Sequence, residues 1–358
     1  MSGSGRRRTL GMGARTVAAI GALAFAALQP APAAAQDRLF SEESEIAFTL
    51  NAPFGKLNRA AKRSTDPVAA TIAVPDAPAP IPLEIAPRGF TRRTSLCSAA
   101  PLRLDFEKPA MRGTVFQGQN KLKLVVQCKP PGLYEQLLLR EYTVYRLYNA
   151  VTPFSFRVRL ARVTYADSED RDPGGARFAF LIEDADDVAK RNGLKQIPAG
   201  PRELNSAQLD PAAAARFALF AFVIGNLDWE YFAGPPGDTC CHNAKLVGTE
   251  GATANIIPVP YDFDFSALVD APYATPPAGL DVASAHERYY RGHCRNNEHL
   301  PAAAALLREK RATLTGIITG ETRLSDSSKR EMLSYLADSY AILDDPRRFE
   351  RLVIGRCR

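Results

Sequence analysis

The feature that most constrains this sequence is a change of pattern near residue 184, where short strand-like runs give way to longer helical runs. Before that point, alternating or β-branched runs are interrupted by proline and glycine, which is typical of strands in a half-buried sheet. The predicted strands cover residues 46–50, 69–74, 81–85, 102–106, 115–116, 121–128, 154–165 and 177–183. One helix is predicted among them, over residues 133–148, because apolar residues recur there at helical spacing.

Helical patterns dominate after residue 184, over residues 186–191, 210–226, 301–319 and 325–343. Asp210-Pro211 is a good helix start, because a capping carboxylate precedes a proline at the first helical position. The prolines of residues 75–80 lie between two strand runs, so a hairpin turn is predicted there rather than a linker. Strands around one helix, followed by several helices, predict an α+β fold.

Residues 1–35 have the pattern of a secretory signal. Three arginines at 6–8 precede an apolar run over 17–28 and the small-residue sequence 33–35. The apolar run is short, and no later stretch is long enough to span a bilayer. We therefore expect an exported protein, located in the periplasm, in the cell envelope or outside the cell, without a stable membrane span after signal cleavage. An uncleaved anchor is the alternative.

Charge and cysteine content narrow the class of protein further. Four of the 45 Lys and Arg residues lie in the signal, which leaves 41 basic residues against 39 acidic ones. A chain this close to neutral, without a basic run, gives no reason to expect a nucleic-acid partner. Six cysteines follow the signal, and an oxidising compartment favours disulfides among them, although the sequence cannot choose the pairing. Zinc binding at Cys240-Cys241-His242 is a weaker alternative, because adjacent cysteines rarely supply separate ligands.

The irregular stretch over residues 227–295 contains most of the residues suited to chemistry. A loop region this long within a compact domain is usually functional. Asp228, then Asn243, then Asp262 and Asp264 supply a carboxylate to orient an acceptor and oxygen ligands to hold magnesium, as phosphoryl transfer requires. Taken singly, the same residues also fit a loop cap, a turn and a strand end.

Taken together, these residues resemble a known family. The order Asn226-Leu227-Asp228, His242-Asn243 and Pro260-Tyr261-Asp262-Phe263-Asp264 is similar to the catalytic half of CotH-type spore-coat kinases, distant relatives of secretory-pathway and HipA-like kinases. Upstream, Arg88-Gly89 resembles the Arg-Gly element of that family, and residues 138–148 resemble its first long helix. The resemblance extends over about residues 46–295.

The resemblance implies a two-lobed atypical protein-kinase-like fold, with a sheet-rich N-terminal lobe over 36–184 and a mainly helical C-terminal lobe over 185–358. It implies transfer of a phosphoryl group from ATP, with Mg or Mn, to a hydroxyl of a protein or a small acceptor. Asp228 is then the catalytic base, Asn243 a metal ligand, Asp262 the main metal-binding carboxylate and Asp264 a second ligand or a support. We expect Asp228, Asn243 and Asp262 to converge on one cleft.

The cation that faces the nucleotide is sought on the strands of the N-terminal half, where Lys121, Lys123 and Arg103 are candidates. Lys123 is preferred, paired with Glu141 on the helix, because such a pair holds the phosphate-binding cation in one rotamer. The alternative is a solvated salt bridge that contributes at most about 1 kcal/mol to stability.

Several features leave the activity open. Phe90-Thr91 stands where the family has Asn and Ser, the sequence has no glycine-rich nucleotide loop, and about fourteen inserted residues separate Asp228 from Asn243. A disulfide from Cys240 in this insertion to Cys294 would hold the loop near the site. Because ATP is scarce outside the cytoplasm, a non-catalytic envelope or surface binding protein on the same fold is the alternative function. A hydrolase that uses Asp262 and Asp264 is disfavoured, because residues two apart on a strand point to the same side.

A cationic and aromatic cluster follows the acidic segment. Arg288 and Arg291 would share one face of a helical turn and hold a phosphate or an acidic substrate, or else they pack on Tyr289 or Tyr290. His242 and His293 are acid–base candidates, but histidines beside cysteines are more often structural.

Overall fold

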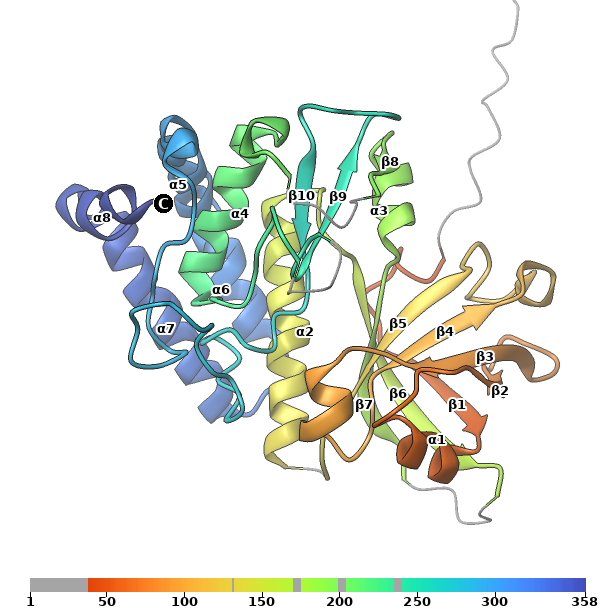
Figure 1. Ribbon diagram of the computed structural model, residues 1–358. Coiled ribbons are helices and arrows are strands. Elements are labelled where there is room, and N and C mark those ends of the chain that lie inside the picture. Colours follow the sequence, from red (N-terminus) through yellow and green to blue (C-terminus); the bar gives the residue numbers. More distant parts are fainter. Residues whose placement is uncertain (1–37, 131, 170–174, 199–203, 235–239) are drawn as a thin grey trace, which may run out of the picture. The chain divides into compact units, whose positions relative to one another are not determined.

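The computed structural model describes residues 38–130, 132–169, 175–198, 204–234 and 240–358, and seven strands in these ranges close into a barrel (Figure 1). The barrel strands are β1 (Ile46–Ala52), β2 (Val68–Ala73), β3 (Ile81–Pro87), β4 (Leu102–Phe106), β5 (Lys121–Val126), β6 (Val158–Asp167) and β7 (Arg177–Ile182). Their order around the ring is β1-β2-β3-β4-β5-β7-β6. Neighbouring strands are antiparallel, except that β6 runs parallel to β1 and closes the ring.

The barrel forms because each strand presents an apolar face to its interior. Every second residue of β1 is buried or nearly so, and β4 shows the same alternation. The inward side chains of Phe48, Leu104 and Leu124 join one apolar cluster that fills the barrel. The outward side chain of Val125 belongs to a second cluster, which continues into the helices. The two faces of β5 therefore serve two different cores.

The predicted two-lobed atypical protein-kinase-like fold is wrong. The strands expected to form the open sheet of an N-terminal lobe instead form a closed ring, and a separate sheet of order β10-β9-β8 lies outside it. The two-residue period of the sequence indicates that one face of each strand is buried, but an open sheet and a barrel share that pattern. Closure depends on β1 pairing with β6, as in the contact of Ile46 with Ala161, and no local pattern encodes it.

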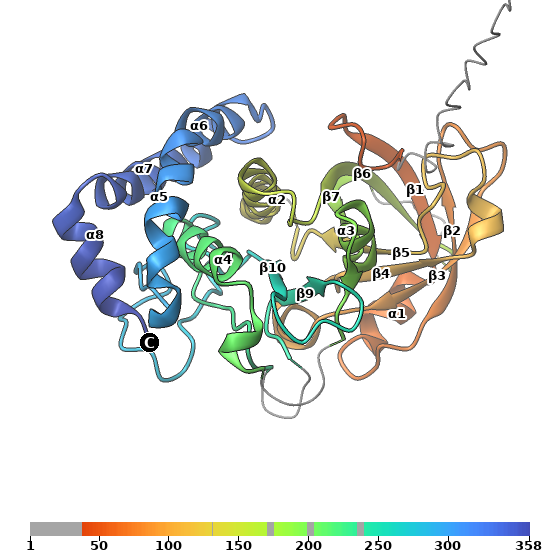
Figure 2. The same cartoon turned by 90° about the horizontal axis from the view of Figure 1, so that it is seen from above.

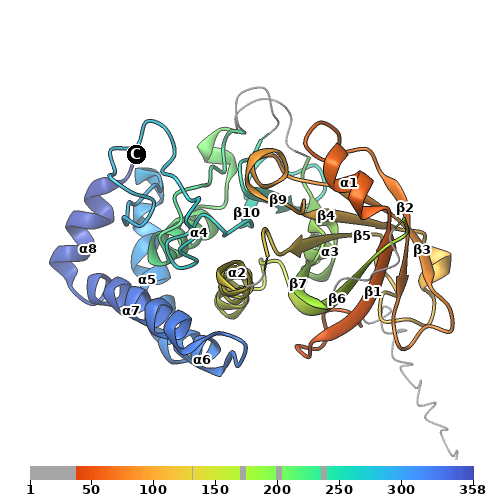
Figure 3. The ribbon, with the colours of Figure 1, turned by 90° about the horizontal axis from the view of Figure 1, so that it is seen from below.

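The helices and the small sheet lie beside the barrel. The helices are α1 (Phe54–Ala60), α2 (Leu133–Val151), α3 (Ala185–Arg191), α4 (Pro211–Ile224), α5 (Leu300–Glu309), α6 (Arg311–Gly320), α7 (Asp326–Leu343) and α8 (Pro346–Leu352). The small sheet contains β8 (Lys195–Gln196), β9 (Ala244–Gly248) and β10 (Ile257–Pro260). Figures 2 and 3 show α2 between the barrel and the helices α4 to α8. Since α2 is buried around most of its circumference, it joins the two parts through one core.

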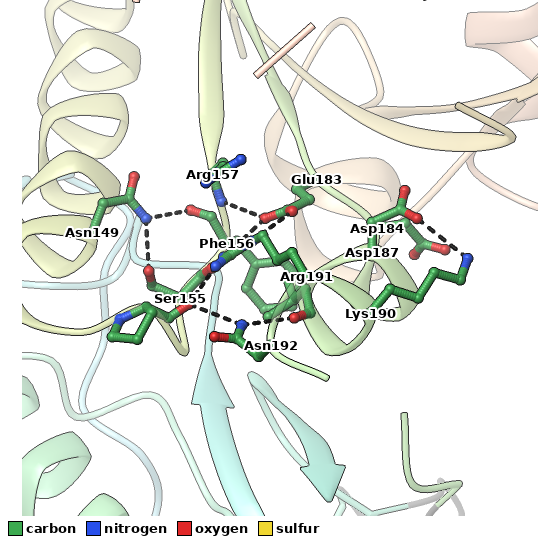
Figure 4. Close-up of polar contacts among 12 residues, drawn as sticks. Asn149, Ser155, Phe156, Arg157, Glu183, Asp184, Asp187, Lys190, Arg191 and Asn192 are labelled. Atoms are coloured by element: carbon green, nitrogen blue, oxygen red, sulfur yellow. Dashed lines mark hydrogen bonds and ion pairs between the residues drawn. The ribbon is translucent and has the colours of Figure 1, made fainter. Parts of the chain in front are cut away.

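A buried ion pair attaches α3 to the end of β7 (Figure 4). Glu183 follows β7 and is 1% exposed, and its carboxylate accepts hydrogen bonds from the backbone of Arg157 at 2.9 Å and from Arg191 Nε at 2.8 Å. Arg191 also donates to the carbonyls of Pro153 and Ser155. Burial raises the pKa of Glu183, while the guanidinium of Arg191 opposes that rise. The network fixes the chain where it leaves the barrel.

Most of the predicted elements are confirmed. The hairpin around residues 75–80 is present, because Ile72 pairs with Ile81 across β2 and β3. The strand predicted at 115–116 is wrong, since these residues lie in turns, and the helix predicted over 301–319 is interrupted at Lys310. The short elements α1, α8 and β9 have no counterpart in the prediction, whereas β10 matches the strand end expected before Asp262.

All six cysteines lie in the described part of the chain and form three disulfides. Cys97 pairs with Cys128, Cys240 with Cys241, and Cys294 with Cys357. The possible Cys240–Cys294 bond is therefore not formed. Disulfides persist in oxidising compartments, in agreement with the predicted location. The predicted signal, residues 1–35, lies outside the described residues.

None of the helices described has both the length and the apolar character needed to cross a bilayer. Asp37–Arg358 forms one compact unit. The boundary predicted at residue 184 lies within this unit and stays a prediction.

Candidate functional site

Three loops surround a cavity of about 300 Å³ between the barrel and the helical part. The first loop follows β3, the second follows α4, and the third follows β10. The lining residues are Arg88, Gly89, Phe90, Thr91, Arg92, Pro101, Asp228, Cys241, His242, Asn243, Tyr261, Asp262, Asp264 and Phe265. The structure thus brings together the four residues predicted as catalytic base and metal ligands. Their chemical roles remain predictions.

The loop that carries Asp228 is fixed on both sides. α4 starts at the Asp210 cap, as predicted, and ends at Gly225, whose φ of 64° is left-handed. A Cβ at Gly225 would collide with the hydroxyl of Tyr335, so glycine is required there. Beyond it, Asn226 Oδ1 accepts a hydrogen bond from the backbone of Asp228 at 3.0 Å. The buried guanidinium of Arg291 donates to the carbonyls on either side of Asp228, including that of Trp229 at 2.6 Å.

The carboxylate of Asp228 is oriented by two neighbours. His242 Nε2 lies 2.7 Å from Asp228 Oδ1, and Asn243 Nδ2 donates to Asp228 Oδ2 at 2.9 Å. The hydrogen bond to Asp228 is the main reason why the pKa of His242 is raised, in spite of its partial burial. Asn243 has a left-handed backbone with φ 52°. Because its amide nitrogen is used on Asp228, its Oδ1 remains as an acceptor that could ligate a cation.

Asp262 and Asp264 follow β10 and differ in their surroundings. Asp262 has φ 63°, and its backbone N–H donates to the hydroxyl of Tyr145 on α2 at 2.8 Å. Its carboxylate makes no hydrogen bond or ion pair with another described residue. Asp264 is buried and accepts a hydrogen bond from Tyr273 at 3.2 Å. Burial, reinforced by the charge of Asp262, raises the pKa of Asp264 well above its usual range. Asp262 is thus the more available of the two predicted ligands.

Arg92 is a residue of the candidate site that the sequence analysis missed. It begins a short π-helical turn (Arg92–Leu96) and donates to Glu141 Oε2 at 3.2 Å and to the carbonyl of Val126 at 3.1 Å. Its guanidinium also lies 3.7 Å from Asp264. Burial opposes its charge, but the surrounding acids keep its pKa above the usual value. The sequence feature that could have identified Arg92 is its position four residues after Arg88, in the segment that resembles the Arg-Gly element.

The predicted pair of Lys123 with Glu141 is wrong, because Arg92 takes that place. Glu141 is 2% exposed, and its Oε1 has no partner among the described residues. Burial raises the pKa of Glu141 well above its usual range, and Arg92 only partly opposes this. The sequence places Lys123 on a strand and Glu141 on the next helix, but it does not show whether they meet. In the structure Lys123 points from the outer face of the barrel toward Tyr261.

Lys123 lies over the ring of Tyr261, with its Nζ 4.2 Å from the ring centroid. Burial, with the positive charges of Arg88 and Lys245, lowers the pKa of Lys123 to about 7, although Asp184 and Asp262 oppose the shift. Lys123 does not line the cavity itself, but Tyr261 does. An amine that is protonated only below about pH 7 therefore lies behind one wall of the site.

The other two predicted cations are farther from the chemistry. Lys121 is exposed on the same face of β5, and Arg103 pairs with Asp105 at 2.6 Å on the neighbouring strand. Neither residue lines the cavity. Arg88 does line it, and its guanidinium forms no hydrogen bond or ion pair with another described residue. On this geometry, Arg88 and Lys123 are better placed than Lys121 or Arg103 to meet an anion.

The donor set suits a magnesium-type ion better than zinc. In the described ranges, no group of three or more His, Cys, Asp or Glu side chains is arranged to hold a metal ion. Magnesium usually binds one or two carboxylates and completes its shell with water and phosphate oxygens. Asp262 and Asp264 could supply the carboxylates, and the amide oxygen of Asn243 could supply a further ligand. The zinc site considered at Cys240-Cys241-His242 lacks its thiolates, because Cys240 and Cys241 are joined in a disulfide.

Arg288 and Arg291, which follow the acidic segment, make contacts inside the protein. Arg288 donates to Ser339 at 2.8 Å and stacks on Tyr335, while Arg291 holds the Asp228 loop. The two residues lie outside helices, so the predicted shared helical face is wrong. The ring of His293 packs edge-on against Phe232, with centroids 4.2 Å apart, and burial lowers its pKa.

No model of a known protein family matches this chain, and no curated protein sequence matches it.

Proposed function

We propose that the cavity around Asp228 binds a nucleoside triphosphate such as ATP with Mg or Mn and transfers a phosphoryl group to a hydroxyl of a protein or a small acceptor. The observation that carries this proposal is the meeting of Asp228 and Asn243, from the loop after α4, with Asp262, from the loop after β10, in one cavity of about 300 Å³. That volume lies within the range of small-molecule sites. The resemblance of the same residues to CotH-type kinases points to the same reaction.

The charges around the cavity favour a polyphosphate with its cation. Asp262 and Asp264 supply carboxylates for the divalent ion, while Arg88 supplies positive charge for phosphate oxygens. When bound, the divalent ion neutralises phosphate charge. Phe90 also lines the cavity and is 76% exposed, so its ring is available to stack on a nucleobase.

Asp228 is suited to orient the acceptor hydroxyl and to accept its proton. Two neighbours fix its carboxylate, and the hydrogen bond with His242 raises the pKa of that imidazole. A proton accepted by Asp228 can therefore be shared with the adjacent ring. Asn243 contributes twice in this proposal, since Nδ2 holds Asp228 and Oδ1 remains for the metal.

The alternative is a non-catalytic binding protein. Two observations favour it. The carboxylate oxygens of Asp228 are already engaged by His242 and Asn243, and the raised pKa of Asp264 leaves less of its carboxylate to bind a metal ion. On this alternative, the cavity holds its ligand without reacting.

Two measurements on the purified protein test the proposal. We expect Mg-ATP, but neither Mg nor ATP alone at the same concentration, to raise the melting temperature. At a hundredfold excess of ligand over Kd, the free energy of unfolding rises by about 2.7 kcal/mol. Asp262→Asn should lose most of this shift. Asp228→Asn should keep it while phosphoryl transfer to a hydroxyl substrate falls by about 10² to 10⁴.

Asp281→Asn, at an exposed aspartate, is the matched control and should behave as the wild type. Transfer by Asp228→Asn at the wild-type rate would show that the assigned role is wrong. A thermal shift in the wild type with no transfer to any hydroxyl acceptor would favour the binding protein. The absence of any shift with Mg-ATP would exclude the nucleotide.

A further inference from the structure

A second cavity, of about 180 Å³, lies at one end of the barrel, beside α1. Its described lining residues all differ from those of the Asp228 cavity. Leu102 at the start of β4 and Val126 at the end of β5 form part of its wall, and both belong to the apolar cluster inside the barrel. The cavity is therefore an outward continuation of the barrel interior. Barrel mouths are frequent positions for ligand sites.

Aromatic rings form another part of the wall. Phe54 on α1 and Tyr165 on β6 line the cavity, and their rings meet edge-on with centroids 5.4 Å apart. An apolar cavity of about 150 Å³ can take up benzene. The size and lining of this cavity therefore suit a molecule with one ring.

Asn58, Gln127 and Arg177 give the cavity its polar lining, and the amide of Gln127 is the buried part of it. Gln127 follows β5, lines the cavity and is 5% exposed, and neither its Oε1 nor its Nε2 has a hydrogen-bond partner in the described structure. The hydroxyl of Tyr165 is likewise buried without a partner. Leaving a buried amide unpaired costs about 1 to 3 kcal/mol, so such groups normally have partners. The polar atoms of Gln127 therefore call for a ligand that offers a donor and an acceptor.

The backbone around Gln127 is held in place. Cys128 forms the disulfide with Cys97, and the backbone N–H of Ser98 donates to the carbonyl of Cys128 at 2.8 Å. These bonds join the chain after β5 to the loop before β4, whose Ala99 and Ala100 also line the cavity. A site fixed in advance loses less entropy when it binds a ligand.

We propose that this cavity is a binding site for a small one-ring compound that carries a primary amide or lactam group. The amide of Gln127 presents one donor and one acceptor side by side, so it can form a paired set of hydrogen bonds with the C=O and N–H of such a group. The ring then packs against Phe54, Tyr165 and the barrel interior. The site is independent of the Asp228 cavity and of its proposed activity.

Three probes of similar size test the proposal by isothermal titration calorimetry. Benzamide offers an acceptor and a donor, benzoate offers only acceptors, and toluene offers neither. We expect saturable binding of one benzamide per chain, with at least about tenfold weaker binding of toluene and of benzoate. Gln127→Leu should weaken benzamide binding by about tenfold or more without weakening that of toluene.

Gln196→Leu, at an exposed glutamine on β8, is the matched control and should bind benzamide as the wild type does. Gln127→Leu should also raise the melting temperature of the ligand-free protein, since it removes an unpaired buried amide. The proposal is overturned if benzamide shows no saturable binding, as expected for a cavity that holds water only. It is also overturned if toluene binds the wild type as tightly as benzamide, a comparison that needs no variant.

Discussion

The carboxylate of Asp228 acquires its properties from neighbours in the same loop. His242 and Asn243 both lie within hydrogen-bonding distance of its oxygens, at 2.7 and 2.9 Å. The guanidinium of Arg291 holds the backbone on either side. The sequence shows these residue types in the right order, but it does not show that the histidine contacts the aspartate.

The pKa of His242 provides a direct test of that contact. Since the hydrogen bond to Asp228 is the main cause that raises this pKa above 6.5, Asp228→Asn should bring it down toward or below that value. Titration of the imidazole signals by nuclear magnetic resonance measures the change, and His242→Gln identifies the signal among the four histidines. An unchanged pKa in Asp228→Asn would contradict the contact.

The lowered pKa of Lys123 predicts that the stability of the protein depends on pH. The pKa of Lys123 falls from 10.5 in the unfolded chain to about 7 in the folded one, so the unfolded chain holds more protons between these values. Wild-type stability therefore rises with pH across this window through this residue, and the penalty is largest below pH 7. Lys123→Met should raise the free energy of unfolding at pH 6.5, and the gain should shrink by pH 10.

Urea denaturation at the two pH values measures this difference. Lys121→Met is the matched control, because Lys121 is an exposed lysine on the same face of β5, and its effect should be small at both values. A gain for Lys123→Met that is equal at pH 6.5 and pH 10 would contradict the interpretation.

At the scale of elements, the predictions succeeded where the cause is local. The capping Asp210 and the following proline start α4, and α2 appears where apolar residues recur at helical spacing. The strand predicted at 115–116 failed because two apolar residues are too few to define a strand against turn chemistry. β9 was missed because its five residues lie in the stretch that the sequence analysis interpreted as irregular, although it pairs with the nearby β10.

The attachment of α3 to β7 predicts an uneven response to mutation along this helix. Glu183→Ala removes the carboxylate that Arg191 contacts at 2.8 Å and leaves a largely buried cation without its partner. We expect the free energy of unfolding to fall by about 3 kcal/mol, as measured by urea denaturation.

Lys190 on the same helix supplies the control. Its ion pair with Asp186, at 2.5 Å, is solvent-exposed, so Lys190→Ala should cost less than about 1 kcal/mol. Equal losses for the two variants would show that the network in Figure 4 has no special role.

At the scale of the whole molecule, disulfides join distant parts of the chain. Cys97–Cys128 spans 31 residues and Cys294–Cys357 spans 63, while Cys240–Cys241 joins neighbours in sequence. Constraint of the unfolded chain grows with the loop that a disulfide closes. Replacing either long-range pair by serines should therefore lower the free energy of unfolding by about 4 kcal/mol.

The corresponding double serine variant at 240 and 241 should change the free energy of unfolding much less, because that bond closes no loop of appreciable length. Denaturation of the three double variants under non-reducing conditions makes the comparison. A loss for the 240–241 variant as large as the other two would mean that the bond stabilises the folded state directly.

The sequence by itself determined most of the barrel strands and the longer helices, the hairpin between β2 and β3, and the choice of Asp228, Asn243 and Asp262 as candidates. These features depend on residue type, period and capping within short segments. Only the tertiary structure decided that the sheet closes, that Arg92 replaces Lys123 as the partner of Glu141, and which cysteines pair. The closure of the sheet, the partner of Glu141 and the two long-range disulfides depend on contacts such as that of Ile46 with Ala161, between residues far apart in the chain. Local patterns carry no information about such contacts, so the barrel and its second cavity emerge only when the whole chain is folded.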